Sequence, residues 1–255
     1  RLDTVSVAGR FDRGVFRADT LALRSNVGTL RGHGPLALMP EAGTSDFDVQ
    51  ATVADAAPLR PLLGGPRLRL RSATARAHVY GTGRTQRFDG TLALNGFLYN
   101  DIRLSDLSAT FRGQRGPSQF LDRLALQGEA GYLSAVGLTA TRTQLDATYD
   151  GTTASLTTTL RLDETHQVEL AAAVAPAATP LKIHLRDLQA QLGPDLWTLQ
   201  ETTALTVGAA YRVDNLRLAR GAQRMRLDGL VAPHGTQPLD ASLSGVRLGD
   251  VRRCM

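Results

Sequence analysis

Histidine, cysteine and the acidic residues are the side chains that would carry metal or acid–base chemistry, and this chain scatters them. No two of its five histidines lie at a metal-ligand spacing such as i, i+2 or i, i+4. Cys254 is the only cysteine, which excludes an internal disulfide and a cysteine-based metal site. The histidines are His33, His78, His166, His184 and His234. We therefore predict neither a metal ion nor a cofactor.

Motifs for nucleophilic catalysis and phosphate binding are also absent. The sequence contains no GxSxG, HExxH, Walker A or GxGxxG, and the run from Gly81 to Gly83 is too short to cradle a phosphate. Asp163 and Glu164 stand in an expected turn, where acidic residues are common for structural reasons. Trp197 could stack on a ligand, but a packing anchor at a sheet corner is the simpler interpretation. We predict that the chain is not an enzyme.

The formal charge of +5 comes almost entirely from arginine, since Lys182 is the only lysine. A sequence pI of about 10.0 suggests nucleic acid as a partner. However, the arginines are spread along the whole chain at polar positions of the predicted strands, which is typical of a solvated face. We therefore predict no nucleic-acid partner, and keep a nucleic-acid-binding β domain as an alternative whose affinity would fall steeply with salt.

Single apolar residues alternate with polar ones along most of the chain, which is the period of a β-strand with one buried face. Leu205 and Val207 flank Thr206, and Leu216 and Leu218 flank Arg217. Such units recur every ~8 to 12 residues without a longer fixed period, which argues against a propeller or a leucine-rich array. Aromatic residues make up only 5% of the chain, so a thick closed core is not expected. The sequence predicts an all-β fold with a thin or open apolar surface.

Turn-forming residues divide the predicted strands. A short helix or irregular crossover is expected at 55–66, and 185–192 fits a helical turn or a strand. The proline-containing stretch 175–180 suggests a boundary between segments 1–175 and 181–255, which could also form one continuous domain. Turns are expected at 32–35, Asp89-Gly90, Asn95-Gly96, Asn100-Asp101, 113–118, Asp214-Asn215 and Asp228-Gly229.

Two stretches carry a pattern found in a known family. In LGPDLWTLQETTALTVGAAYRVDNLRLARGAQRMRLDGLVAP a tryptophan precedes an alternating strand and a run of the form i.nl.l..g.q.i.l.G. Upstream, the segment beginning DAAPLRPLLGG fits an "ldl.pl..l" piece followed by strands, with Arg71-Ser72 where a glycine is common. Both resemble the TamB (translocation and assembly module subunit) and AsmA-like proteins. The matching positions of the first stretch are Trp197, Val213, Asn215, Leu216, Leu218, Gly221, Gln223, Met225, Leu227 and Gly229.

This resemblance implies a long, strongly curved, antiparallel-rich sheet, shaped like a trough with an apolar concave face and at most one or two short helical turns. It implies a periplasmic segment of a protein anchored in the inner membrane of a Gram-negative envelope. The groove would hold or conduct phospholipid acyl chains between the membranes and support outer-membrane biogenesis. An Omp85-type barrel protein of the outer membrane would be a partner through other parts of the parent chain.

Strand phase predicts which side chains would line such a groove, although a slip of one residue inverts a strand. The sequence begins at Arg1 and has neither a signal peptide nor a ~20-residue apolar run, so we expect a segment of a longer protein. The main alternative is a structural β-sandwich or solenoid spacer of a surface or adhesin protein with no lipid role. The predicted lining residues are Leu92, Leu94, Ile102, Leu104, Leu107, Phe111, Leu156, Leu160, Val168, Leu170, Leu205, Val207, Leu216, Leu218 and Leu227.

Overall fold

Strands account for all the regular structure that the computed structural model describes, and within each compact unit they pair antiparallel. This confirms the predicted all-β, antiparallel fold, and no helix occurs in the described residues. The chain divides into unit 1, residues 1–151, and unit 2, residues 152–255. The described residues are 2–54, 68–99, 102–116, 121–135, 138–176, 178–207, 211–231 and 238–245.

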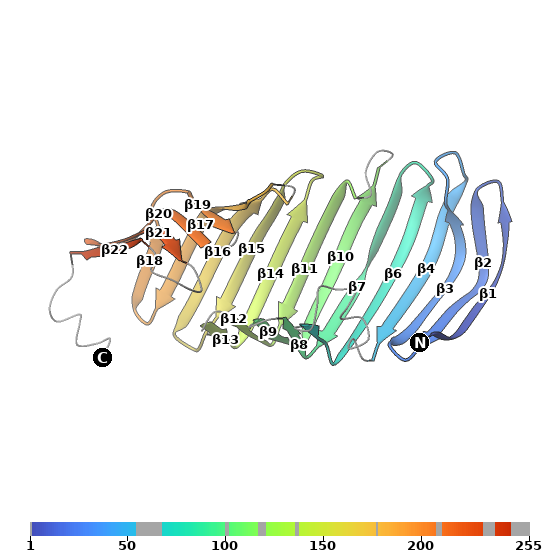
Figure 1. The fold of residues 1–255 in the computed structure, drawn as a ribbon, viewed down its shortest axis with the longest axis horizontal. Helices are drawn as coiled ribbons and strands as arrows, with labels where there is room; N and C mark the ends of the chain where they lie inside the picture. The colour runs from blue at the N-terminus through green and yellow to red at the C-terminus, as the bar shows by residue number, and fades with distance from the viewer. Residues whose placement is uncertain are drawn as a thin grey trace. The chain divides into compact units, whose positions relative to one another are not determined.

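Nine strands of unit 1 pair side by side in a single main sheet, and Figure 1 shows them as the row from blue to yellow-green. Each is joined to its neighbour by antiparallel pairing. In order they are β1 (Leu2–Asp12), β2 (Val15–Ser25), β3 (Gly28–Ala37), β4 (Thr44–Val53), β6 (Ser72–Thr82), β7 (Gln86–Asn95), β10 (Leu107–Arg115), β11 (Arg123–Ala130) and β14 (Arg142–Tyr149).

The alternating sequence explains why these strands share one apolar face. Residues directly opposite each other in an antiparallel pair point to the same side of the sheet. Leu94 pairs with Leu107 and Leu92 with Ala109, so the apolar phases of β7 and β10 coincide. Leu92 in turn pairs with Ala75 of β6, which carries the same phase one strand further. The hydrophobic pattern therefore sets the register across the sheet.

Five short strands of unit 1 form a second sheet, which we call the tip sheet. Its strands continue the ends of the long strands beyond a bend, so that β7 leads into β8 through Gly96 and β9 into β10 through Asp106. Both bend residues have left-handed backbone angles, with φ of 64° and 51°. The order of the tip sheet is β13 (Leu138–Ala140), β12 (Tyr132–Ala135), β9 (Ile102–Ser105), β8 (Phe97–Tyr99) and β5 (Leu68–Arg69).

Unit 2 is a meander in which two short strands, placed end to end, occupy the place of one strand between two longer neighbours. β17 pairs with β18 along one half and with β19 along the other, and both short strands then pair with β20. The strands are β15 (Ala154–Arg161), β16 (His166–Val174), β17 (Leu181–Leu192), β18 (Asp195–Leu199), β19 (Thr203–Val207), β20 (Tyr211–Arg220), β21 (Gln223–Val231) and β22 (Leu239–Ser244). Residues 185–192 thus belong to a strand, the second of the two expected alternatives.

Several expected turns lie inside strands instead. Residues 32–35 belong to β3, Asp89-Gly90 to β7, Asp214-Asn215 to β20 and Asp228-Gly229 to β21, so those predictions are wrong. In β20 the pair register shifts between Val213 and Leu216, and Asn215 has a φ of 53°, which marks a β-bulge rather than a turn. Asx and glycine residues are favoured in both settings, which is why the sequence did not distinguish them.

Other expectations about the connections have different outcomes. Asn95-Gly96 forms a bend, whereas the expected turn at 113–118 begins later because β10 extends to Arg115. The expected helix or crossover at 55–66 and the turn at Asn100-Asp101 lie outside the described residues. The stretch 175–180 falls within unit 2, between β16 and β17, which pair along their length.

Candidate functional site

Apolar residues of six neighbouring strands of unit 1 share one face of the main sheet, which we call the floor. Most of its side chains are half-buried, Phe47 and Ala109 are buried, and no large side chain in the described part of the chain is below 2% exposed. The described strands of the floor make their main contacts with their neighbours in the sheet. The floor comprises Phe47, Val49 and Ala51 of β4, Ala75, Ala77 and Val79 of β6, Phe88, Leu92 and Leu94 of β7, Leu107, Ala109 and Phe111 of β10, Leu124 and Leu126 of β11, and Leu145 and Ala147 of β14.

Phenylalanine rings of the floor lie over glycines of the neighbouring strand. Phe111 pairs with Gly90 and Phe88 with Gly113, in reciprocal positions of β7 and β10. A Cβ on Gly90 would lie 2.6 Å from the Cζ of Phe111, and one on Gly113 would lie 2.1 Å from the Cζ of Phe88. The ring centroids are 6.2 Å apart. These glycines therefore let the rings lie against the backbone, an arrangement that compensates for glycine inside a strand.

The tip sheet covers one end of the floor. At this end the floor positions Ala130 and Thr143 are 1% and 8% exposed. Their neighbours on the opposite face, Glu129 and Gln144, are exposed. Because only the floor side is covered at this end, the strands bend toward the floor at residues such as Gly96 and Asp106. The hydroxyl oxygen of Thr143 is buried there without a hydrogen-bond partner.

Loop 38–43 covers the other end of the floor. Ala42 of this loop packs with Val15 and Ala37 in a small buried cluster. Ser45 and Gln86, which occupy floor positions beside it, are 3% and 7% exposed. Their burial and that of Thr143 at the far end show that both ends of the floor are covered, whereas most positions between them are half-buried.

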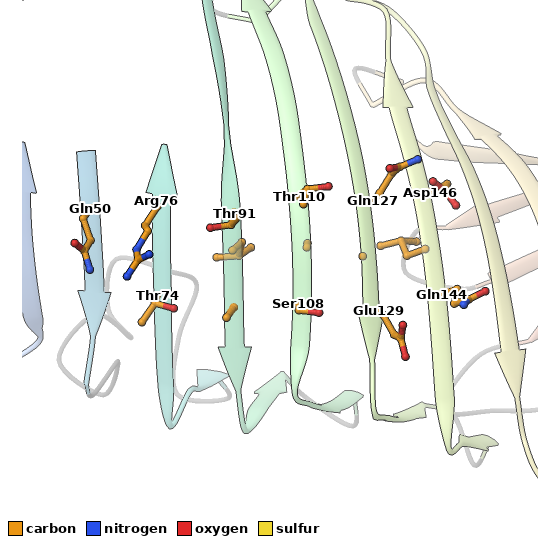
Figure 2. A pocket seen from close by; sticks show the side chains of 15 residues that line it. Gln50, Thr74, Arg76, Thr91, Ser108, Thr110, Gln127, Glu129, Gln144 and Asp146 are labelled. Atoms are coloured by element: carbon orange, nitrogen blue, oxygen red, sulfur yellow. The ribbon is translucent and has the colours of Figure 1, made fainter. Parts of the chain in front are cut away.

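The opposite face of the same strands is polar. A shallow hollow of about 760 Å³ crosses β4, β6, β7, β10, β11 and β14 there. Figure 2 shows the side chains that project into it, among them Thr91, Thr110 and Gln127, which each neighbour a floor residue in sequence. Glu129 accepts a hydrogen bond from Arg142 at 2.6 Å, and this bond raises the pKa of Arg142. Both side chains of this ion pair are exposed, which shows that this face is solvated. Exposed ion pairs contribute little to stability.

The register brings two histidines together that the sequence does not suggest. Asp48 lies between His33 and His78 on adjacent strands β3, β4 and β6. Its carboxylate is 3.5 Å from Nε2 of His33 and 3.0 Å from Nδ1 of His78. Sequence spacing could not reveal this row, because the histidines meet only through strand pairing. No group of three or more His, Cys, Asp or Glu side chains among the described residues could hold a metal ion.

The predicted lining residues of unit 1 lie in two places. Leu92, Leu94, Leu107 and Phe111 share the floor. Leu104 is half-buried on β9 of the tip sheet, where it pairs with Phe97 and Leu133 and not with floor strands. Ile102 begins β9, but its side chain lies outside what the structure describes.

The predicted lining residues of unit 2 lie on one face of that unit. Leu160 pairs with Val168, Leu216 with Leu227, and Leu205 with Val213, so the apolar phase passes from strand to strand. All are half-buried except Leu218, which is buried. Trp197 is half-buried on the same face, opposite Ala190. The nine residues are Leu156, Leu160, Val168, Leu170, Leu205, Val207, Leu216, Leu218 and Leu227.

One carboxylate of unit 2 has a strongly shifted pKa for a local reason. Asp163, between β15 and β16, accepts hydrogen bonds from the backbone N–H of Thr165 at 2.7 Å and of His166 at 2.8 Å. The Thr165 N–H, followed by the imidazole of His166, lowers the pKa of Asp163 to about 2. The arrangement closes a turn, and it lies on the exposed surface rather than on the apolar face.

Comparison of the chain with protein-family models, with curated proteins and with solved structures finds no match. Among the described residues there is no helix with the length and apolar character that crossing a membrane requires.

Proposed function

We propose that the floor binds acyl chains and that the chain serves as a lipid-holding or lipid-conducting segment. The observation that carries this proposal is an apolar sheet face whose middle positions are mostly half-buried between two covered ends. Exposed apolar areas of this kind on folded proteins usually mark binding surfaces. Between Leu107 and Gly113 the floor of β10 extends for about 20 Å along the strand. One leaflet of the ~30 Å hydrocarbon core spans about 15 Å, so an acyl chain fits along a strand.

In the wider setting, the proposal makes the chain part of a TamB- or AsmA-like protein of a Gram-negative envelope. The periplasmic location, the movement of phospholipid between membranes and an Omp85-type outer-membrane partner all belong to the proposal. Its supports are the residue pattern quoted above and a sheet with one apolar and one polar face. A spacer of a surface protein remains the competing role, and it requires no affinity for lipid.

Adjacent residues of β7 on opposite faces provide a matched test. Leu92→Asp places a charge on the floor, whereas Thr91→Asp places the same charge on the polar face. We expect Leu92→Asp to weaken binding of cis-parinaric acid about tenfold, because the carboxylate would have to be desolvated beneath the chain. Thr91→Asp should change binding less than about twofold. Titrations of probe fluorescence measure both, and absence of binding by the native chain would favour the spacer.

A further inference from the structure

One charged residue, Arg115, occupies a position on the same face of the sheet as the floor, at the end that loop 38–43 covers. Arg115 is the last residue of β10. It lies two residues after Gly113, so both residues are on the floor side of the strand. It pairs with Gln86 of β7, whose side chain is also on the floor side. Among the described residues of β4, β6, β7, β10, β11 and β14, every other floor position is apolar, glycine or an uncharged polar residue.

A long hydrogen bond connects the exposed Arg115 side chain to a buried polar network. Its Nη1 donates to Oε1 of Gln86 at 3.4 Å. The amide nitrogen of Gln86 donates in turn to the carbonyl oxygen of Ala37 at 2.6 Å and to the hydroxyl of Ser45 at 3.0 Å. The Ser45 hydroxyl also accepts from the N–H of Ala37 at 2.9 Å. Gln86 is thereby fixed with its carbonyl oxygen toward Arg115, which orients the guanidinium at the edge of the floor.

Arg115 forms no ion pair with a carboxylate of the described residues. Asp122, the residue directly before β11, has its carboxylate against Gly116. Glu41 of loop 38–43 is paired with Arg84. A guanidinium presents five donors in a planar fork that suits phosphate and carboxylate oxygens. One of these donors contacts Gln86, so others can point toward a ligand.

We infer that Arg115 binds the anionic head of an acyl amphiphile whose chain lies on the floor. This inference rests on the proposed function and adds the position and charge of the head group. An acyl chain on the floor buries only part of its apolar surface, so it gains only part of the stabilisation of an enclosed chain. The loss of translational and rotational freedom on association offsets much of this gain. The chain alone therefore binds weakly, and the contact with the head group decides which amphiphiles are held.

Two lipids that differ only in the phosphate group test the inference. Oleoyl lysophosphatidate and monooleoylglycerol share the chain and the glycerol, and both are titrated against the full chain by displacement of cis-parinaric acid. We expect Arg115→Gln to weaken lysophosphatidate binding about tenfold and to leave monooleoylglycerol binding unchanged. Arg115→Lys should recover part of the loss because it keeps the charge.

Arg112→Gln is the matched control, since it removes an arginine of the same strand from the polar face. If Arg112→Gln weakens lysophosphatidate binding as much as Arg115→Gln does, general surface charge accounts for the effect and the inference is wrong. Equal weakening of both lipids by Arg115→Gln would also overturn it, because that result indicates a structural role. Displacement of lysophosphatidate by millimolar inorganic phosphate would indicate a site for free anions.

Failure of the inference differs from failure of the proposed function. If Arg115→Gln and the native chain bind both lipids equally well, the floor binds acyl chains but Arg115 does not select the head group. If the native chain binds neither lipid, the proposed function fails and the inference with it. Circular dichroism and thermal unfolding of each variant verify that the sheet is intact.

Discussion

Gly90 stands inside β7 with backbone on one side and an aromatic ring on the other. A Cβ at this position would lie 2.1 Å from the carbonyl oxygen of Arg76 and 2.6 Å from the Phe111 ring. The ring could move away, but the carbonyl belongs to the paired strand β6 and could move only by distorting the ladder. The glycine that the sequence suggests as a turn residue is thus required by close packing within the sheet.

We expect Gly90→Ala to destabilise the chain by about 1–3 kcal/mol, the range of overpacking substitutions. Gly131→Ala is the control, because a Cβ there would make only ordinary contacts, the nearest at 3.7 Å from Asp106. Urea unfolding followed by circular dichroism measures both variants. A change below about 0.5 kcal/mol for Gly90→Ala would contradict the packing argument.

Asp163 provides a pH-dependent prediction. Its pKa of about 2 lies below the ordinary 3.8, so the ionised form stabilises the folded turn. This contribution is fully present above about pH 3.8 and is lost as the pH falls through about 2. A carboxyl-detected NMR titration should give a midpoint near 2 for Asp163, and Asp163→Asn should remove this part of the acid sensitivity. A midpoint near 3.8 would show that the backbone hydrogen bonds do not persist in solution.

At the scale of elements, the floor depends on bends that turn strand ends into the tip sheet. Asp106 adopts a φ of 51°, and its carboxylate accepts a hydrogen bond from the Asn95 side chain at 3.3 Å across the bend. Asp and Asn tolerate this left-handed region, whereas β-branched residues do not. The bend between β9 and β10 is therefore encoded locally.

Asp106→Val should cost about 1–2 kcal/mol, the penalty for a left-handed conformation at a residue with a hindered Cβ. We expect Asp106→Asn to be nearly neutral. Hydrogen exchange followed by mass spectrometry should show faster exchange in β9 and β12 of the valine variant, with β4 and β6 unaffected. Equal protection of the tip sheet in both variants would mean that Asp106 does not control the bend.

The sequence predicted best those strands whose apolar and polar residues alternate within a single segment of the chain. Alternation predicted the strands and placed Leu92, Leu94, Leu107 and Phe111 in one phase. Features that depend on pairing between distant strands could not be predicted. The row of His33, Asp48 and His78 exists only through register, and Gly90 reads as a turn residue unless the Phe111 ring above it is known.

Arg115 illustrates the same limit at the end of an element. The sequence GQRGPS suggests a loop from Gly113 onward, which would leave Arg115 without a defined face. In the structure, pairing with β7 extends β10 to this residue, and Arg115 donates a hydrogen bond to the buried Gln86. Strand ends are set by neighbours as much as by local sequence, so the functional interpretation of Arg115 needed the fold.

At the scale of the molecule, the main sheet of unit 1 has an apolar face and a polar face. No large side chain of the described residues is buried to below 2% exposure. The floor consists mainly of Leu, Val and Ala, and its phenylalanine rings Phe88 and Phe111 lie against glycines of the neighbouring strand. Neutralisation of polar-face arginines by pairs such as Arg142–Glu129 keeps the basic composition from acting as one large charged patch. Both properties are expected of a surface that carries apolar ligands through water.

The most direct test of this account is to map where an acyl chain touches the protein. A lysophosphatidate with a diazirine in its chain can be photolysed on the native protein and the attachment sites located by mass spectrometry. We predict attachment at floor residues such as Leu92, Phe111 and Leu126. Attachment at their polar-face neighbours Thr91, Thr110 and Gln127, or none above background, would contradict the claim that the open floor binds acyl chains.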